Sequence, residues 1–292
     1  MVSDTKSGGK NMKKRLMDEL TDVFPILFTL NLNLENFEVK KLKSKRNEVY
    51  EVIINAIMEN LPQTFIVKHF LGDTAEIEVK ILRLLSSQGL LVPNIIKHEN
   101  LYLLLEKKDG QNMCDFINFN LINVNRLSEV APNIRNSLKN SVKGLATWFA
   151  ELHRNNIFQS SNSDKIIVLN KGDVRLRDFI FDPATNQVYG VDFETSYKGD
   201  YLEDLSGLCC SLLDTNPGIF EIPEPQHKIN LINIFLKTYY KLNKTFIHSF
   251  NFDKFYSLLL DELKLVKTRR NLGSVHLNGK RIINKIHDPT NF

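Results

Sequence analysis

The sequence predicts an α+β protein built in two parts: an antiparallel sheet with one inserted helix, followed by a mainly helical region. Short β-type runs are concentrated in residues 37–106. Beyond residue 110, apolar residues recur mainly at helical spacing, interrupted by one hairpin pattern at 171–194. The 292 residues suit one large domain or two lobes. We place the boundary after the last strand of the sheet, which gives parts 1–106 and 107–292.

The composition is that of a soluble globular protein, with 42% apolar and 25% charged residues. The net charge of +4 is too small to indicate nucleic-acid binding by itself. The three cysteines show no CxxC spacing, so neither a disulfide framework nor a zinc site is expected. Neither a signal peptide nor a run of membrane-spanning length is visible. We therefore expect a cytoplasmic protein that has no membrane partner.

The N-terminal part is predicted to hold five strands and one inserted helix. Residues 1–11 are expected to form a disordered tail, and 12–24 a short helix ended by Pro25. Strands are expected at 37–42, 49–54, 64–70, 93–96 and 101–106, the first two as a hairpin around the polar residues 44–47. A helix at 74–88 follows the third strand and is ended by Gly89.

The second part is predicted to be mainly helical because its apolar residues recur three or four positions apart. Helices are expected at 136–154, 202–213, 227–241 and 253–267. Many aromatic residues lie in this part, and we interpret them as core rather than as a ligand cage. They are Trp148, Phe235, Tyr239, Tyr240, Phe246, Phe250 and Phe255.

The hairpin pattern at 171–194 carries three aspartates. Two strand-like runs flank the turn formers of residues 182–187. Asp178 enters the hairpin and Asp192 leaves it, each seven residues from Thr185. Positions equidistant from the turn of an antiparallel pair lie opposite each other, so we expect the two carboxylates to meet. With Asp173 one short loop earlier, the three acids predict a site that holds a divalent cation and activates a hydroxyl.

Lys68 lies inside the apolar third strand, and Glu78 lies ten residues later on the predicted helix. A strand lysine that points away from solvent needs an anion, either a carboxylate or a phosphate. One interpretation is therefore a Lys68–Glu78 pair that orients nucleotide phosphates. The alternative is an exposed edge-strand lysine and a solvated helix glutamate.

The order of these motifs resembles the aminoglycoside phosphotransferase and choline kinase branch of the protein-kinase-like fold. The similarity extends from about residue 37 to 215, and each motif is short. The motifs are Phe65-Ile66-Val67-Lys68, the helix from Glu78 to Leu85, 103–106 with Gly110, 145–154, Gly172-Asp173 with Asp178, Val191-Asp192-Phe193-Glu194, and Asp204-Leu205. The resemblance implies a bilobal fold with an antiparallel N-terminal sheet and a helical C-terminal lobe.

The resemblance also implies ATP and Mg²⁺ as cofactors and gives the polar residues roles. Asp173 would accept or orient the proton of the acceptor hydroxyl. Asp178, Asp192 and Glu194 would hold Mg²⁺. Nucleotide contacts would come from Lys68 paired with Glu78, from the backbone at Glu106, and from Lys45 and Arg46 in the turn that covers the phosphates. The implied reaction is transfer of the γ-phosphate to a hydroxyl of a small molecule.

Several residues depart from the family's pattern. The turn at 43–47 contains no glycine, Lys171 replaces a histidine, Asp178 an asparagine and Glu194 a glycine. An aspartate still ligates Mg²⁺ and adds one negative charge, which favours metal binding. These departures leave open a second interpretation, a catalytically impaired nucleotide-binding pseudokinase or scaffold.

A basic region at 264–292 includes Lys267, Arg269, Arg270, Lys280 and Arg281. It suggests either docking of RNA or a protein, or a solvated tail, and we favour the tail. An atypical protein kinase that binds its substrate there is the third interpretation. The twelve-residue interval between Asp192 and Asp204 is too short for the activation loop of a regulated protein kinase. A basic pI also disfavours a cationic aminoglycoside acceptor.

Overall fold

The computed structural model describes residues 4–28, 34–56, 61–159, 165–273, 282 and 284–291. The chain divides into two compact units, the first comprising residues 1–84 and 93–108 and the second 85–92 and 109–292. The segment 85–92 thus belongs to the second, helical unit, although it precedes residue 93 of the first unit in the sequence. The predicted single boundary after residue 106 assigns this segment to the first unit instead. Across the described ranges, none of the helices combines the length and apolar character needed to cross a bilayer.

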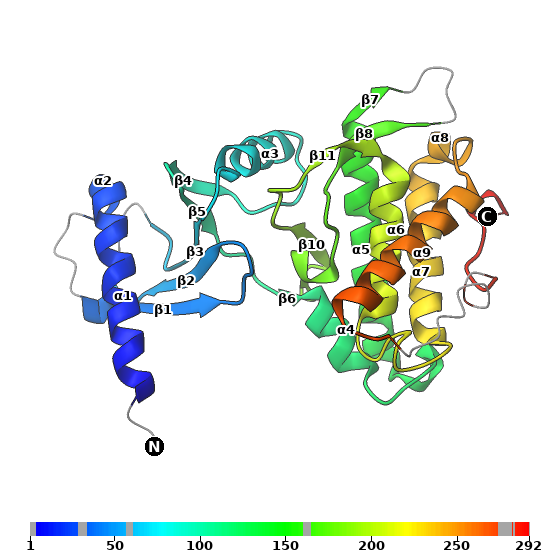
Figure 1. Ribbon diagram of the computed structural model, residues 1–292, viewed down its shortest axis with the longest axis horizontal. Coiled ribbons are helices and arrows are strands. Elements are labelled where there is room, and N and C mark those ends of the chain that lie inside the picture. Colours follow the sequence, from blue (N-terminus) through cyan, green and yellow to red (C-terminus); the bar gives the residue numbers. More distant parts are fainter. Residues whose placement is uncertain are drawn as a thin grey trace. The chain divides into compact units, whose positions relative to one another are not determined.

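The first unit is built on a five-stranded antiparallel sheet of order β1-β2-β3-β5-β4 (Figure 1). The strands are β1 (Phe37–Leu42), β2 (Glu48–Ile54), β3 (Thr64–His69), β4 (Ile95–Glu99) and β5 (Tyr102–Glu106). The predicted N-terminal sheet is therefore confirmed. The fourth strand begins at Ile95, two residues later than predicted. Pro93 has no backbone N–H to donate to a neighbouring strand.

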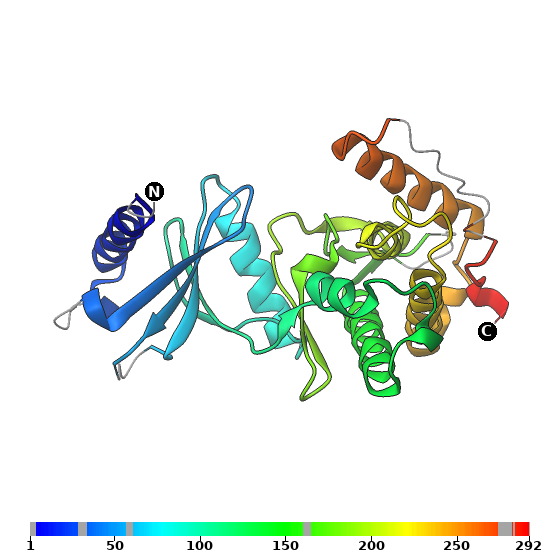
Figure 2. The same cartoon turned by 90° about the horizontal axis from the view of Figure 1, so that it is seen from below.

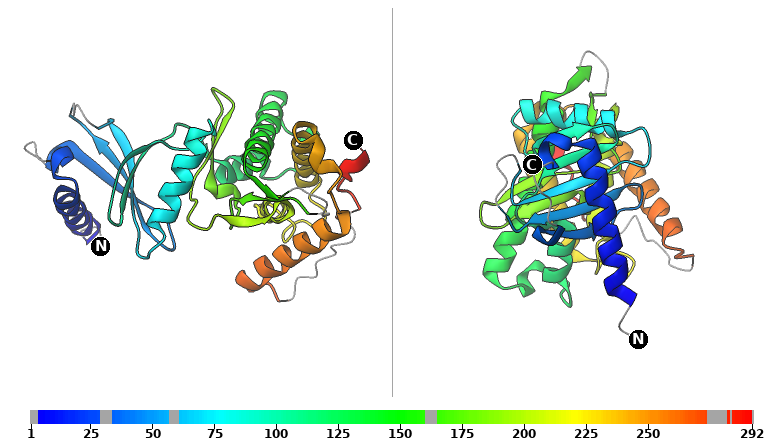
Figure 3. Two further views of the ribbon diagram at one scale, coloured as in Figure 1. Left: turned by 90° about the horizontal axis from the view of Figure 1, so that it is seen from above. Right: turned by 90° about the vertical axis from the view of Figure 1, so that its left-hand side faces the viewer.

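Helix α1 (Asp4–Val23), followed by α2 (Pro25–Phe28), covers one face of this sheet (Figure 3). The prediction of a disordered tail over residues 1–11 is wrong from Asp4 onward. The apolar side of the helix, which includes Leu16 and Leu20, is buried in the same core cluster as Phe65 and Val67 of β3. A helix gains most of its stability from such packing.

Side chains alternate between the two faces of β3. Phe65 and Val67 belong to the core beneath α1, so Lys68 projects from the opposite face. Helix α3 (Ala75–Ser87) follows β3 and carries Glu78 in its first turn. The odd-numbered residues Phe65 and Val67 face the core beneath α1, so the even-numbered Lys68 faces the other side of the sheet.

The second unit is mainly helical, as predicted. Its helices are α4 (Met113–Leu121), α5 (Pro132–Asn155), α6 (Tyr201–Asp214), α7 (Gln226–Leu242), α8 (Lys244–Ile247) and α9 (Phe252–Arg269). Helix α5 packs against α7, and α6 packs against α9. The aromatic residues interpreted as core are indeed packed together, with Phe149, Phe235 and Tyr239 buried between α5 and α7.

Two small sheets of the second unit frame the aspartate-bearing segment. One has the order β10-β9-β6 and the other β11-β8-β7. Their strands are β6 (Gln111–Asn112), β7 (Ile157–Gln159), β8 (Ile167–Asn170), β9 (Phe179–Asp182), β10 (Gln187–Gly190) and β11 (Tyr197–Asp200). The β9–β10 hairpin packs along α5 (Figure 2). The loop from β8 to the 3₁₀ turn Leu176–Asp178 carries Asp173, and the loop from β10 to β11 carries Asp192 and Glu194.

Candidate functional site

The loop after β8 is held by one buried carboxylate, that of Asp204 on α6. Its Oδ2 accepts the backbone N–H of Lys171 at 2.7 Å, and its Oδ1 accepts that of Gly172 at 3.2 Å. The same Oδ2 lies 3.2 Å from Nε2 of His153 on α5, and Nδ1 of His153 lies 2.8 Å from the hydroxyl of Tyr239. Because a carboxylate only accepts, Nε2 of His153 donates to Asp204 and Nδ1 accepts from Tyr239. Three helices thus fix the loop.

Gly172 is required by the shape of this loop. Its φ is +70°, and an added Cβ would lie 2.2 Å from the carbonyl oxygen of Thr195. The next residue, Asp173, also has a positive φ of 37°. Non-glycine residues in this region are uncommon and are enriched at functional sites. The loop therefore presents Asp173 in a tightly specified backbone conformation.

The side chain of Asp173 is exposed and is bound by Arg175. Nη2 of Arg175 lies 2.7 Å from Oδ1 and 2.8 Å from Oδ2 of the carboxylate. Such charge-assisted contacts to both oxygens orient the carboxylate as well as stabilising its ionised form. Sequence reasoning missed Arg175, although a basic residue two positions after the proposed catalytic aspartate was visible.

The register of the hairpin differs by one residue from the prediction. Gln187 pairs with Asp182 and Gly190 with Phe179. The next backbone contact joins the N–H of Val191 to the carbonyl of Asp178, at 2.9 Å. Asp178 therefore lies opposite Val191, not Asp192. The reason is the four-residue turn 183–186, whose centre lies between Ala184 and Thr185 rather than at Thr185.

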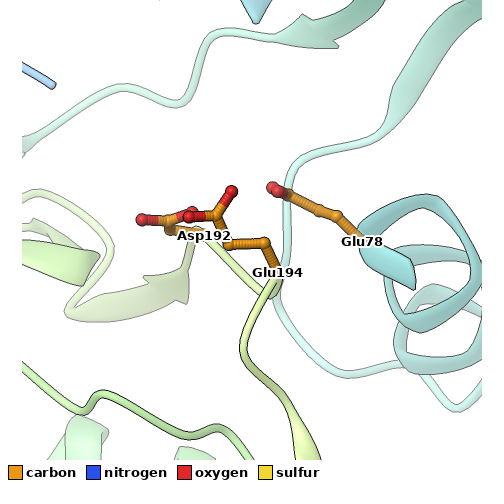
Figure 4. Close-up of side chains that lie close together, drawn as sticks. All are labelled: Glu78, Asp192 and Glu194. Carbon is orange, nitrogen blue, oxygen red and sulfur yellow. The ribbon is translucent and has the colours of Figure 1, made fainter. Parts of the chain in front are cut away.

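Asp192 and Glu194 lie side by side on the loop after β10 (Figure 4). One carboxylate oxygen of each lies within 4.8 Å of the other. Asp192 is exposed and has a φ of 65°, whereas Glu194 is buried. Carboxylate oxygens are the donors that Mg²⁺ prefers, so the chemistry of this pair fits a magnesium ion.

Asp178 faces the buried side chain of Lys171. Nζ of Lys171 lies 3.8 Å from Oδ2 of Asp178 and donates to the backbone carbonyl of Asp192 at 2.9 Å. Burial raises the pKa of Asp178 to about 6; the ammonium of Lys171 opposes this rise and the charge of Asp192 adds to it. The oxygens of Asp178 thus lie beside a cation, and the carboxyl group is a candidate metal ligand.

In the first unit, Lys68 and Glu78 form a buried ion pair. Nζ of Lys68 lies 2.6 Å from Oε2 of Glu78 and 4.9 Å from the centre of the Phe70 ring. The alternative of an exposed lysine and a solvated glutamate is therefore wrong. Glu78 is positioned by the first turn of α3, where its N–H donates to the carbonyl of Thr74 at 3.2 Å.

The remaining nucleotide-binding candidates lie at the ends of strands of the same sheet. Lys45 and Arg46 are exposed in the turn between β1 and β2. Glu106 ends β5; its N–H donates to the carbonyl of Asn94 at 2.9 Å, and its Oε2 accepts from Lys108 at 2.8 Å. The nucleotide-binding roles of Lys45, Arg46 and Glu106 stay predictions.

The basic C-terminal region is only partly described. Arg270 follows α9 and pairs with Asp214 at 2.5 Å and with Glu221 at 2.8 Å. Lys280 and Arg281 lie outside the described residues. Arg270 is thus paired within the second unit. The preferred interpretation of 264–292 as a solvated tail stays a prediction, and docking of a nucleic acid or protein stays the disfavoured alternative.

Comparisons with known proteins support the fold. No protein-family model matches the sequence, and no curated protein does so either. Among solved structures, a choline kinase from Cryptosporidium parvum is 14% identical, with a TM-score of 0.51, covering 93% of this chain and 92% of that one. An aminoglycoside 3′-phosphotransferase of type VIII is 15% identical, with a TM-score of 0.54, covering 85% and 98%. An ethanolamine kinase from Plasmodium vivax is 13% identical, with a TM-score of 0.51, covering 92% and 89%.

At these identities the likeness concerns the fold. The matched structures span nearly the whole chain, including the antiparallel sheet and the helical unit. This chain therefore has the α+β fold shared by choline kinases, ethanolamine kinases and aminoglycoside phosphotransferases, as the order of its motifs predicted.

Proposed function

We propose that this chain is a phosphotransferase that uses ATP and Mg²⁺ to phosphorylate a hydroxyl of a small molecule. The observation that carries the proposal is the position of Asp173 on a loop that Asp204 fixes, in the same unit as the paired carboxylates Asp192 and Glu194. The fold supports it, since the similar structures are small-molecule kinases. One aminoglycoside phosphotransferase, from Streptomyces rimosus, was solved with ADP and streptomycin; it is 14% identical, with a TM-score of 0.50.

In this proposal each acid of the second unit has a distinct role. Asp173 accepts or orients the proton of the acceptor hydroxyl, because it is the exposed carboxylate of the fixed loop. Asp192, Glu194 and Asp178 hold Mg²⁺. When bound, the ion neutralises charge on the phosphate oxygens. Positioning and charge neutralisation supply most of the rate enhancement of phosphoryl transfer.

The first unit supplies the nucleotide contacts. Lys68 contacts the phosphates and is oriented by Glu78 at 2.6 Å. The contact with Glu78 fixes the position of the Lys68 ammonium, which can then bind a phosphate oxygen as a second anion. Lys45 and Arg46 cover the phosphates from the turn without glycine, and the backbone at Glu106 binds the base.

The acceptor is proposed to be neutral or anionic. Arg175 places a guanidinium 2.7 Å from the carboxylate that must receive the hydroxyl proton. Arg175 balances the charge of this carboxylate, so Asp173 offers no unpaired negative charge to attract a cationic acceptor.

A cytoplasmic location is part of the proposal. Cys114, Cys209 and Cys210 are all free thiols, and the last two are buried. Free cysteines fit a reducing compartment, which is also where ATP is plentiful.

The thermal stability of the full chain tests the proposal, measured without ligand, with ATP, with Mg²⁺ and with both. We expect ATP and Mg²⁺ together to raise Tm more than either alone, because the ion and the phosphates bind as a unit. Lys68→Met should lose this response, whereas Lys41→Met should keep it. Lys41 pairs with Glu48 at the same 2.6 Å but at the surface, so it is a matched control. Absence of any ligand response in the unaltered chain would overturn the proposal.

A nucleotide-binding protein without transfer activity is the second candidate. The contact of both Asp173 oxygens with Arg175 favours it, because the carboxylate is already engaged. Incubation with ATP, Mg²⁺ and a panel of hydroxyl compounds separates the two. Stabilisation by ATP without phosphorylation of any compound would support this candidate, and phosphorylated product would exclude it.

A further inference from the structure

Lys171 is one of the most buried charged side chains of the second unit, with 1% of its surface exposed. It lies in the loop that Asp204 fixes through a backbone N–H, whereas its side chain contacts Asp192 and Asp178. Its Nζ donates to the carbonyl of Asp192 at 2.9 Å. The rings of Phe179 and Phe193 lie 5.6 and 5.3 Å from the same nitrogen. The carbonyl and the two rings carry no full negative charge.

A buried ammonium costs several kcal/mol unless a carboxylate compensates it. Carbonyl and ring contacts supply only part of that compensation. Asp178 supplies the rest, since its Oδ2 lies 3.8 Å from Nζ and only 14% of its side chain is exposed. Conversely, Asp178 needs a cation, because an ionised carboxylate with so little exposed surface is costly without a partner.

We infer that Lys171 and Asp178 act as one neutral unit, in which Lys171 is the built-in counter-ion of Asp178 and also holds the loop of Asp192. In this arrangement the extra carboxylate at position 178 adds no net charge to the site. Lys171 is a positioning residue: it bonds to the backbone of Asp192, whose φ of 65° needs outside support.

The two departures from the family's pattern at these positions are thereby one coupled change. The lysine and the aspartate together carry no net charge. A single exchange at either position would leave one buried charge without its partner. All these contacts lie within the second unit. Only the consequence for metal binding rests on the proposed function.

A double-mutant cycle on the full chain tests the inference. Tm is measured for the unaltered chain, Lys171→Met, Asp178→Asn and the double variant, with divalent ions chelated and no nucleotide. We expect each single variant to lose on the order of 5 °C or more. The double variant should lose clearly less than the sum of the two, because neither charge is then left alone.

Lys254→Met is the matched control, since Lys254 pairs with another aspartate, Asp200, in the same unit. Its effect should add to that of Asp178→Asn. If the losses of Lys171→Met and Asp178→Asn add in the same way, the inference is wrong. If Lys171→Met does not fold, recovery of folded protein by adding Asp178→Asn supports the inference, and no recovery overturns it. The cycle involves no nucleotide, so its failure is distinct from failure of the proposed transfer.

Discussion

Nε2 of His153 lies 3.2 Å from Oδ2 of Asp204, and both side chains are buried. This contact joins α5 to α6 and fixes the carboxylate that holds the loop of Asp173. The hydroxyl of Tyr239 at the other ring nitrogen extends the chain of contacts to α7. The proposed catalytic loop is therefore supported by three helices, although its own residues are consecutive in the sequence.

Asp204→Asn should destabilise the protein and slow turnover. The amide keeps one acceptor oxygen but presents an NH₂ group to a backbone N–H or to His153, leaving a buried donor unsatisfied. Such a loss costs about 1–3 kcal/mol, and more where a charged group is involved. Urea unfolding gives the free energy, and ADP release gives turnover. Asp182→Asn is the control, because Asp182 also accepts a backbone N–H, that of Ala184 at 2.9 Å, but in an exposed turn. Equal effects of the two variants would contradict the anchoring role of Asp204.

Lys68→Met and Glu78→Gln should each destabilise the first unit. Each leaves a buried charge without its partner at 2.6 Å, which costs about 3–5 kcal/mol. The double variant should recover part of this loss, because both charges of the pair are then removed together. Urea unfolding measures all three. The pair Lys41–Glu48 at the surface should show a coupling of about 1 kcal/mol or less. Equal coupling in both pairs would show that burial does not strengthen the Lys68–Glu78 interaction.

Lys228→Met should stabilise the protein near pH 7. Lys228 on α7 is fully buried, and within the described residues no acceptor reaches its Nζ. Burial lowers its pKa from 10.5 to about 7. Because the folded pKa lies below the unfolded value, the unfolded chain holds this proton more tightly. The folded state is therefore penalised most at pH 7 and below, and the penalty falls as the pH rises toward 10.5.

The free energy of unfolding at several pH values measures this effect. We expect the unaltered chain to gain stability between pH 7 and pH 9, by about 2 kcal/mol. Lys228→Met should remove that gain. Lys241→Met, an exposed lysine on the same helix, should retain it. Parallel pH curves for the unaltered chain and Lys228→Met would contradict the assignment.

Asp192→Asn and Glu194→Gln should each weaken the response to Mg²⁺. Their carboxylate oxygens lie within 4.8 Å of each other, so one ion can bind both. Loss of one charged ligand lowers metal affinity, and the shift of Tm with Mg²⁺ concentration reports it. Asp261→Asn removes an exposed carboxylate of α9 and should leave the response unchanged. A response that survives both site variants would place the ion elsewhere.

Much of the fold follows from sequence patterns because those patterns are local. The strands of the first sheet and the long helices of the second unit show clear periods of two and 3.6 residues. Helix α1 was underestimated because its N-terminal turns are polar, and only its packing through Leu16 and Leu20 explains its length. The register of the hairpin was misplaced by one residue, because the centre of a four-residue turn falls between two residues.

The site residues that belong to short contiguous motifs could be predicted from the sequence. Contacts between residues far apart in the sequence could not. Asp173, Asp192 and Glu194 belong to short motifs. By contrast, His153 meets Asp204 across 51 positions in the sequence, and Lys171 meets the carbonyl of Asp192 across 21. No local pattern encodes such contacts. The pairing of Lys171 with Asp178 was visible only as two separate departures from the family's pattern.

The role of Asp173 is the central claim, and turnover of Asp173→Asn tests it most directly. ADP release from ATP and Mg²⁺ is measured in the presence of a hydroxyl acceptor that the unaltered chain phosphorylates, with Asp182→Asn as the control for an exposed aspartate. We predict that Asp173→Asn slows transfer about 10²–10⁴-fold while its Tm still rises with ATP and Mg²⁺. Transfer at the unaltered rate in this variant would contradict the account.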